Sequence, residues 1–170
     1  MPRLAEGEFA LVWQHLEQAG GGSTDPVRWG SAVTDLDFHV LYADAAARAH
    51  DAELLARFVP LAEQGAEKYG HRLYSAIALR ARGVQAALAD QAAEAVACQD
   101  RALSIFEGLG TRYQIGLTLT ERARALAVQG NLAAARADWS RAATMFDAVG
   151  AVPAARLVRD SLAALGDNRA

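Results

Sequence analysis

Three residues with metal-binding side chains stand close together in the segment TDLDFH: Asp35, Asp37 and His39. Carboxylate and imidazole groups are ordinary ligands of zinc, so this segment is the first place where chemistry could occur. On a helix only Asp35 and His39, four residues apart, share a face, while Asp37 points away. Because two ligands do not make a site, the sequence predicts no metal centre here.

Nucleophilic catalysis has little support elsewhere in the chain. Cys98 is the single cysteine, so no disulfide can form within the chain, and no His or Lys stands beside it to lower its pKa. The remaining histidines, His15, His50 and His71, are scattered. The Gly-rich run at residues 20–23 lacks the lysine and the preceding strand of a phosphate-binding loop. We therefore expect a protein that is not an enzyme and binds no cofactor; an enzyme whose residues form no recognisable motif is the alternative left open.

Length and charge narrow the class of protein further. The chain has 170 residues, which suits one domain, and its net charge of -3 argues against a dedicated nucleic-acid binder. The N-terminus lacks the apolar run of a signal peptide and no window is apolar enough to span a bilayer, so we expect a cytoplasmic protein with no membrane partner.

Five basic and eleven acidic side chains give residues 1–70 a net charge of -6, and twelve basic and nine acidic ones give residues 71–170 a net charge of +3. Halves of opposite charge would make the chain an electric dipole, which would favour head-to-tail association into a homo-oligomer. The alternative is that both charged surfaces are only solvated by water.

The chain repeats itself with a period of 40 residues. Residues 71–110 align with residues 111–150 without a gap, and residues 31–70 form a more diverged copy. The identical pairs other than alanine are Arg72/Arg112, Leu79/Leu119, Arg82/Arg122, Arg101/Arg141, Phe106/Phe146 and Gly110/Gly150. We therefore predict one domain over residues 1–170, with repeats at 31–70, 71–110 and 111–150, an N-terminal helix and Gly-rich loop at 1–25, and a capping helix at 151–165.

Each repeat is predicted to contain two helices. Apolar and small residues recur at spacings of three and four, as in Leu132, Ala135, Trp139, Ala142 and Phe146, and no segment alternates in the way a strand does. The predicted helices cover residues 3–18, 26–49, 51–68, 71–89, 91–108, 111–129, 131–148 and 151–165.

Glycine marks the expected helix ends. Gly70, Gly110, Gly130 and Gly150 stand where a helix needs a left-handed residue to stop. Pro60 is the one residue that opposes the pattern, because inside a helix it removes a hydrogen bond and crowds the preceding turn. We expect it on the outer surface, either at a kink or where one helix is broken in two.

The stretch GNLAAARADWSRAATMF is similar to the second half of a tetratricopeptide repeat, with Gly130, Asn131, Leu132, Ala135 and Ala142 at the positions of that motif. The small residue that the family places in the first helix of each pair is matched by Ala43, Gly83 and Ala123. The period of 40 departs from the usual 34, and the terminal proline of the motif is missing. Long-period variants of this kind resemble helical regions of bacterial transcriptional regulators and signalling ATPases. The resemblance implies an all-α, right-handed α-solenoid of helix-turn-helix repeats with terminal capping helices.

The same resemblance implies a binding groove lined by the first helix of each pair. It places Arg82 and Arg122 at equivalent positions in that groove, with Tyr42 in the first repeat, and Leu79, Leu119 and His39 one turn earlier. A row of guanidinium groups suits carboxylates, so the expected partner is a protein or peptide with an acidic side chain or a C-terminal carboxylate. The alternative is that Arg82 pairs with a nearby acid such as Glu121 and only solvates the surface.

Two functions are consistent with these features of the sequence. The first is a protein-protein or protein-peptide interaction module, either free-standing or part of a larger bacterial regulator. The second is a regulatory sensor that binds a short peptide or small ligand and relays a change in the curvature of the solenoid. The sequence does not identify the partner.

Overall fold

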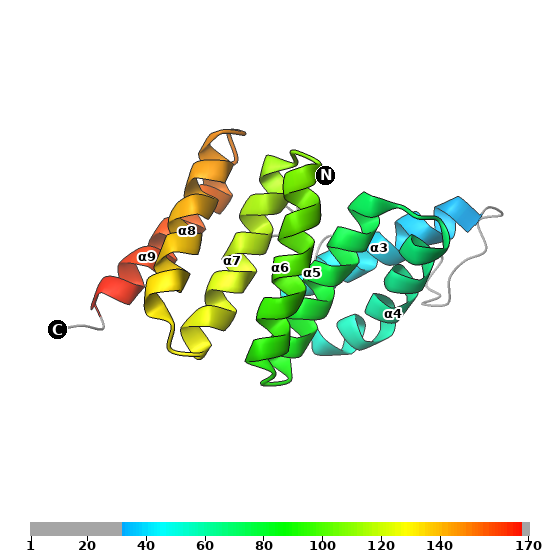
Figure 1. Cartoon of the computed structure of the whole chain (residues 1–170), viewed down its shortest axis with the longest axis horizontal. Helices are drawn as coiled ribbons and strands as arrows, with labels where there is room; N and C mark the ends of the chain where they lie inside the picture. The colour runs from blue at the N-terminus through cyan, green and yellow to red at the C-terminus, as the bar shows by residue number, and fades with distance from the viewer. Residues whose placement is uncertain (1–31, 168–170) are drawn as a thin grey trace.

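A computed structural model describes residues 32–167 of the chain, and all regular structure in this part is helical (Figure 1). The helices are α3 (Ala32–Ala49), α4 (Ala52–Lys68), α5 (Arg72–Leu88), α6 (Ala92–Gly108), α7 (Arg112–Val128), α8 (Leu132–Asp147) and α9 (Val152–Asp167). The six helices predicted between residues 51 and 165 are confirmed to within a few residues, as is the all-α class. Of the helix predicted at 26–49, the structure describes the part from residue 32; the helix predicted at 3–18 lies outside the described residues.

The turns between these helices share one geometry. At each turn a residue with positive φ is followed by an N–H that bonds to the carbonyl five positions earlier, as from Thr111 to Phe106 at 3.1 Å and from Ala151 to Phe146 at 2.9 Å. This is the hydrogen bond of a Schellman motif. The residues with positive φ recur every 20 positions: His50, Gly70, Asp90, Gly110, Gly130 and Gly150. The predicted glycine stops are confirmed, and two turns use a residue other than glycine.

Pro60 lies within α4, which is continuous from Ala52 to Lys68. The residue is exposed, so its ring lies on the surface of the helix. The alternative of a helix broken in two at Pro60 is therefore wrong.

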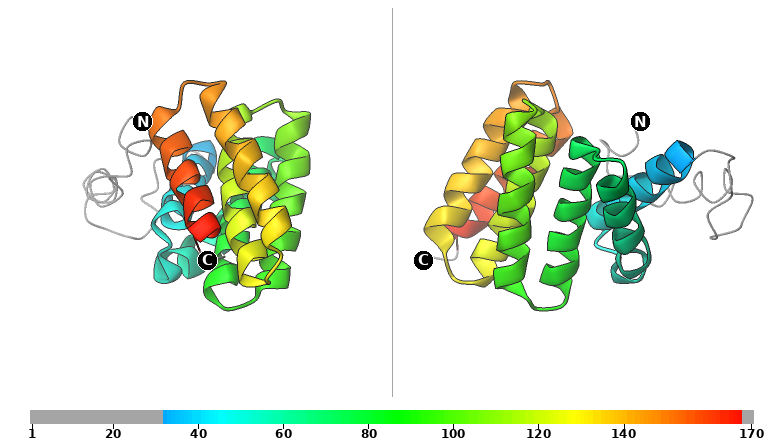
Figure 2. Two further views of the ribbon diagram at one scale, coloured as in Figure 1. Left: turned by 90° about the vertical axis from the view of Figure 1, so that its left-hand side faces the viewer. Right: turned by 45° about the vertical axis from the view of Figure 1, so that its right-hand side comes forward.

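The helices pack in sequence order, each against the next one along the chain (Figures 1 and 2). The first helices of the three pairs also touch one another: α3 contacts α5, and α5 contacts α7. The second helices α4, α6 and α8 scarcely contact each other. The first helices therefore share a continuous face, which we call the inner face.

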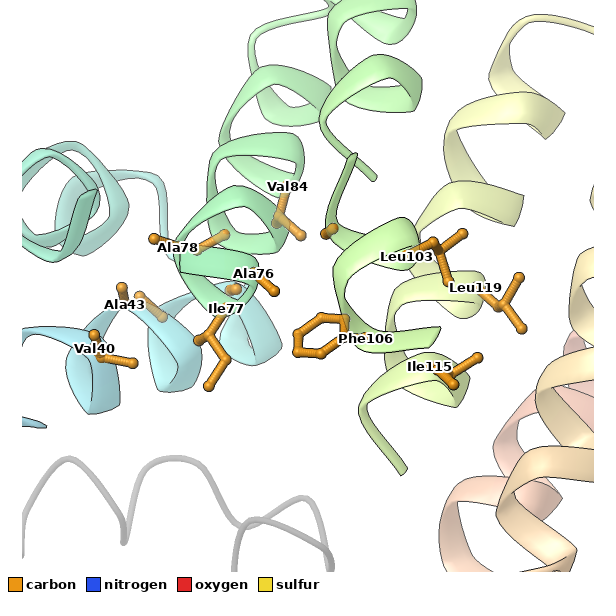
Figure 3. Close-up of a cluster of buried hydrophobic side chains, with 14 of the residues drawn as sticks. Val40, Ala43, Ala76, Ile77, Ala78, Val84, Leu103, Phe106, Ile115 and Leu119 are labelled. Carbon is orange, nitrogen blue, oxygen red and sulfur yellow. The ribbon is translucent and has the colours of Figure 1, made fainter. Parts of the chain in front are cut away.

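Small residues allow the close helix contacts of this core, part of which Figure 3 shows. Ala43 and Ala123 are fully buried, and Gly83 lies so close to α6 that an added Cβ would stand 2.5 Å from Nε2 of Gln99 and 3.1 Å from the carbonyl oxygen of Ala95. Phe106 on α6 points toward Ile77 on α5 (Figure 3), and the centre of its ring lies 5.3 Å from the guanidinium carbon of Arg80, also on α5. No helix within residues 32–167 is long and apolar enough to cross a membrane.

Candidate functional site

The predicted row of Tyr42, Arg82 and Arg122 points toward the second helices. The Tyr42 ring lies 4.5 Å from that of Phe58 on α4, and the Arg82 guanidinium binds both carboxylate oxygens of Glu63, also on α4. The three residues do occupy equivalent positions, as the repeat predicts. Their printed partners lie on the second helices, and binding of a partner by this row stays a prediction.

Arg122 is held by two acidic residues from different pairs. It donates to both oxygens of Asp138 on α8 at 2.7 Å and to Asp100 on α6. Hydrogen bonding to Asp138 raises the pKa of Arg122 above its usual value. The guanidinium is therefore occupied by carboxylates of this chain, and an acidic partner would have to compete with them.

The other predicted groove residues are partly or wholly internal. Tyr42 is 4% exposed and Leu119 is 0% exposed, so both belong to the core and present no surface to a partner. Leu79 and His39 are half-buried. The alternative expected for Arg82 is an ion pair with a nearby acid such as Glu121. Arg82 does form an ion pair, but its partner is Glu63.

The inner face carries a buried polar network centred on Arg80. This side chain, on α5, donates to Asp44 on α3 at 2.5 Å and to Oε1 of Gln114 on α7 at 2.6 Å. Asp44 also accepts from Arg48 at 3.1 Å, and Arg48 reaches the hydroxyl of Tyr113 on α7 at 3.3 Å. The network thus ties all three first helices together on one face.

A second charged cluster lies beside it, where the turn after α3 meets α7. Nε2 of His50 lies 3.2 Å from Oε2 of Glu121 and 3.5 Å from Nη1 of Arg124, and Arg124 also donates to Glu121. Burial raises the pKa of Glu121, but the hydrogen bond from His50 and the charge of Arg124 outweigh it, so the pKa lies below its usual value. Glu121 is therefore a carboxylate whose charge is already balanced.

Next to this cluster the surface is hollowed by a cavity of about 120 Å³, which we call the α5–α7 slot. Its lining comes from the C-terminal halves of α5 and α7, the first half of α6 and the two turns that contain His50 and Asp90. The residues that line it are His50, Gly83, Val84, Ala87, Leu88, Asp90, Ala92, Gln99, Glu121, Arg124, Ala125 and Val128. The slot combines mainly apolar walls with a charged rim, as ligand sites do.

Leu88 and Val128 are the large apolar residues of the slot that are exposed to solvent. They are 40 residues apart, so they occupy equivalent positions of successive repeats, and they are 42% and 77% exposed. Neither residue is among the predicted groove positions, because those positions follow a family pattern and not the helix ends. Their signal was present in the sequence as two large apolar residues placed directly before a turn.

The remaining residues considered for chemistry do not converge. Asp37 accepts a hydrogen bond from the hydroxyl of Tyr74, which raises the pKa of Tyr74 to about 12. Cys98 is buried, and burial together with Glu94 raises its pKa to about 11. Within residues 32–167 no three His, Cys, Asp or Glu side chains come together as a metal site would require.

The chain was compared with protein-family models, with curated proteins and with solved structures, and none of the three comparisons gave a match.

Proposed function

We propose that this chain is a tetratricopeptide-like, right-handed solenoid of cytoplasmic location that binds a segment of a partner protein or peptide. The observation that carries the proposal is the exposure of Leu88 and Val128 at equivalent positions beside the α5–α7 slot. Large apolar side chains at the edge of a cavity are typical of protein contact sites. Repetition of such a side chain from one helix pair to the next suits a ligand that runs along the stack.

The experiment is capture of partners from an extract of the native cell by the full chain, with two matched double variants as controls. The variant Leu88→Ser/Val128→Ser alters the slot. The variant Val152→Ser/Leu157→Ser removes apolar side chains that are 71% and 65% exposed on α9, away from it. We expect the first variant to lose a captured protein that the second retains. Equal capture by both variants would exclude the slot as the binding surface.

The row of Arg82 and Arg122 makes a separate prediction in the same assay. If an acidic or carboxylate-terminated partner displaces Glu63, Asp100 and Asp138 from these guanidinium groups, the variant Arg82→Ala/Arg122→Ala loses capture. If these contacts only join the helices, the variant captures the partner as the unaltered chain does.

A regulatory sensor is the second candidate, and the links between the first and third helix pairs favour it. Arg48 contacts Tyr113, and His50 contacts Glu121, across the width of the second pair. A ligand that altered the curvature of the stack would have to break or remake these contacts.

A distance measurement separates the two candidates. Spin labels on Ala56→Cys and Ser140→Cys, in a Cys98→Ser background, report the separation of α4 and α8. A sensor changes this distance distribution when the captured partner binds, whereas an adaptor leaves it unchanged.

A further inference from the structure

The two turns without glycine line the same cavity. Four of the six turns in the described part of the chain have glycine at the residue with positive φ, and the other two have His50 (φ 52°) and Asp90 (φ 59°). Glycine adopts this conformation without steric cost, whereas a residue with a Cβ is strained in it, less so for Asp, Asn and His than for other types. Both His50 and Asp90 line the α5–α7 slot. Two of the six described turns thus carry a side chain where glycine would fit, and the place of both side chains at the slot points to a role for them.

The side chains of His50 and Asp90 differ in their contacts with charged groups of the chain. His50 is joined to Glu121 and lies beside Arg124, so three of the four charged or titratable groups of the slot are paired among themselves. Asp90 is exposed, and no ion pair within residues 32–167 involves it. The slot therefore has one unpaired negative charge at its rim, which is complementary to a cation.

The walls of the slot suit an unbranched aliphatic chain. Val84, Ala87 and Ala125 line its sides, and the exposed Leu88 and Val128 extend it toward the solvent. At about 30 Å³ for each water molecule, a volume of about 120 Å³ holds about four heavy atoms. The aliphatic stem of a lysine side chain has four carbons, and it carries its charge at its end, where the ammonium group can remain at the rim.

We propose that the α5–α7 slot takes a lysine side chain of the partner segment, with the methylene stem against Leu88 and Val128 and the ammonium group at the carboxylate of Asp90. The inference rests on the proposed function, and it names the chemistry of the ligand at that site. It differs from the acidic partner expected for Arg82 and Arg122, whose guanidinium groups are occupied.

The test is a titration of the ¹⁵N-labelled full chain, followed by amide chemical shifts, with two probes that differ in one group. Nα-acetyl-lysine methylamide carries the ammonium group, and Nα-acetyl-norleucine methylamide has the same aliphatic stem without it. We expect both probes to shift amides at residues 83–90 and 121–128. An exposed ion pair contributes about 0.2–1 kcal/mol, so we expect the lysine probe to bind about 1.5- to 5-fold more tightly.

Two substitutions show whether Asp90 makes the difference. Asp90→Asn retains the size of the side chain and tolerates positive φ, and Asp90→Gly removes both the carboxylate and the strain, so neither is expected to unfold the protein. In both variants we expect the preference for lysine over norleucine to fall to about one.

The inference is overturned if neither probe shifts the amides of the slot, if norleucine binds as tightly as lysine to the unaltered chain, or if the preference survives in both Asp90 variants. Its failure is distinct from failure of the proposed function. Capture that depends on Leu88 and Val128 but is unaffected by Asp90→Gly would retain the interaction module and reject the lysine.

Discussion

Asp44 is the carboxylate on which the polar network of the inner face depends, and its replacement by alanine is the most informative perturbation of the fold. Arg80 is 2% exposed, and Asp44 is 8% exposed. Without Asp44, Arg80 retains only neutral acceptors, with Oε1 of Gln114 at 2.6 Å and Oγ1 of Thr118 at 3.4 Å. A buried guanidinium would then lack a counter-ion.

The magnitude follows from this burial. Removal of one partner of a buried ion pair costs about 3–5 kcal/mol, because the remaining charge is left uncompensated. The pair between Arg82 and Glu63 provides the control, since its side chains are 35% and 34% exposed. Breaking such a half-exposed pair by Glu63→Ala costs at most about 1 kcal/mol.

Urea unfolding followed by circular dichroism measures both values. We expect Asp44→Ala to lower the free energy of unfolding by several kcal/mol more than Glu63→Ala, with similar urea dependence. We also expect Asp44→Ala/Arg80→Met to be more stable than Asp44→Ala alone, because the unpaired charge is gone. Equal losses in the two single variants, or no recovery in the double variant, would show that Asp44 is not the essential counter-ion of Arg80.

The same pair has a consequence for acid stability. Burial raises the pKa of Asp44, but Arg80 and Arg48 outweigh it, so the folded pKa lies below the usual value. A lowered folded pKa means that Asp44 stabilises the protein above an unfolded pKa of about 3.9 and that this contribution is lost as the pH falls through the folded pKa. The stability difference between the unaltered chain and Asp44→Asn should therefore shrink below about pH 4, as acid titrations of urea unfolding would show.

Three further changes test other parts of the structure. Gly83→Ala should destabilise the protein by about 1–3 kcal/mol in urea unfolding, because its Cβ would stand 2.5 Å from the buried amide of Gln99; a stabilised variant would contradict the close contact of α5 and α6. Asp90→Gly should raise the free energy of unfolding by about 0.5–1 kcal/mol, since relief of strain exceeds the added entropy of the unfolded chain; an unchanged or lower value would show that Asp90 is not strained. Cys98, with its pKa raised to about 11, should react slowly with iodoacetamide at pH 7.5 in the folded protein and rapidly in urea; fast reaction of the folded protein would contradict its burial.

The sequence predicted the helices well because their ends carry local signals. Gly70, Gly110, Gly130 and Gly150 all adopt the left-handed conformation that a helix stop requires. His50 and Asp90 adopt it too, and residue type alone did not reveal them. The spacing of 20 residues between turns would have found both positions.

The candidate site was harder to predict, because it depends on which side of each first helix faces which neighbour. Arg82 and Arg122 stand one residue before the small positions Gly83 and Ala123, and this places them against the second helices. Leu119 lies one helical turn before Arg122, a position at which the repeat predicts a groove residue, but its side chain is fully buried. The periodicity of a sequence identifies the apolar face of each helix. Whether that face packs in the core or remains available to a partner depends on how all three helix pairs pack together.

Photo-crosslinking in the native cell tests the proposed binding of a partner at the α5–α7 slot. The crosslinking amino acid p-benzoylphenylalanine would be placed at Leu88 or Val128, and as controls at Val152 or Leu157 on α9, which are also exposed. We expect the same discrete crosslinked protein from the two slot positions and none from the two α9 positions. No product at Leu88 and Val128, or the same product from all four positions, would contradict it.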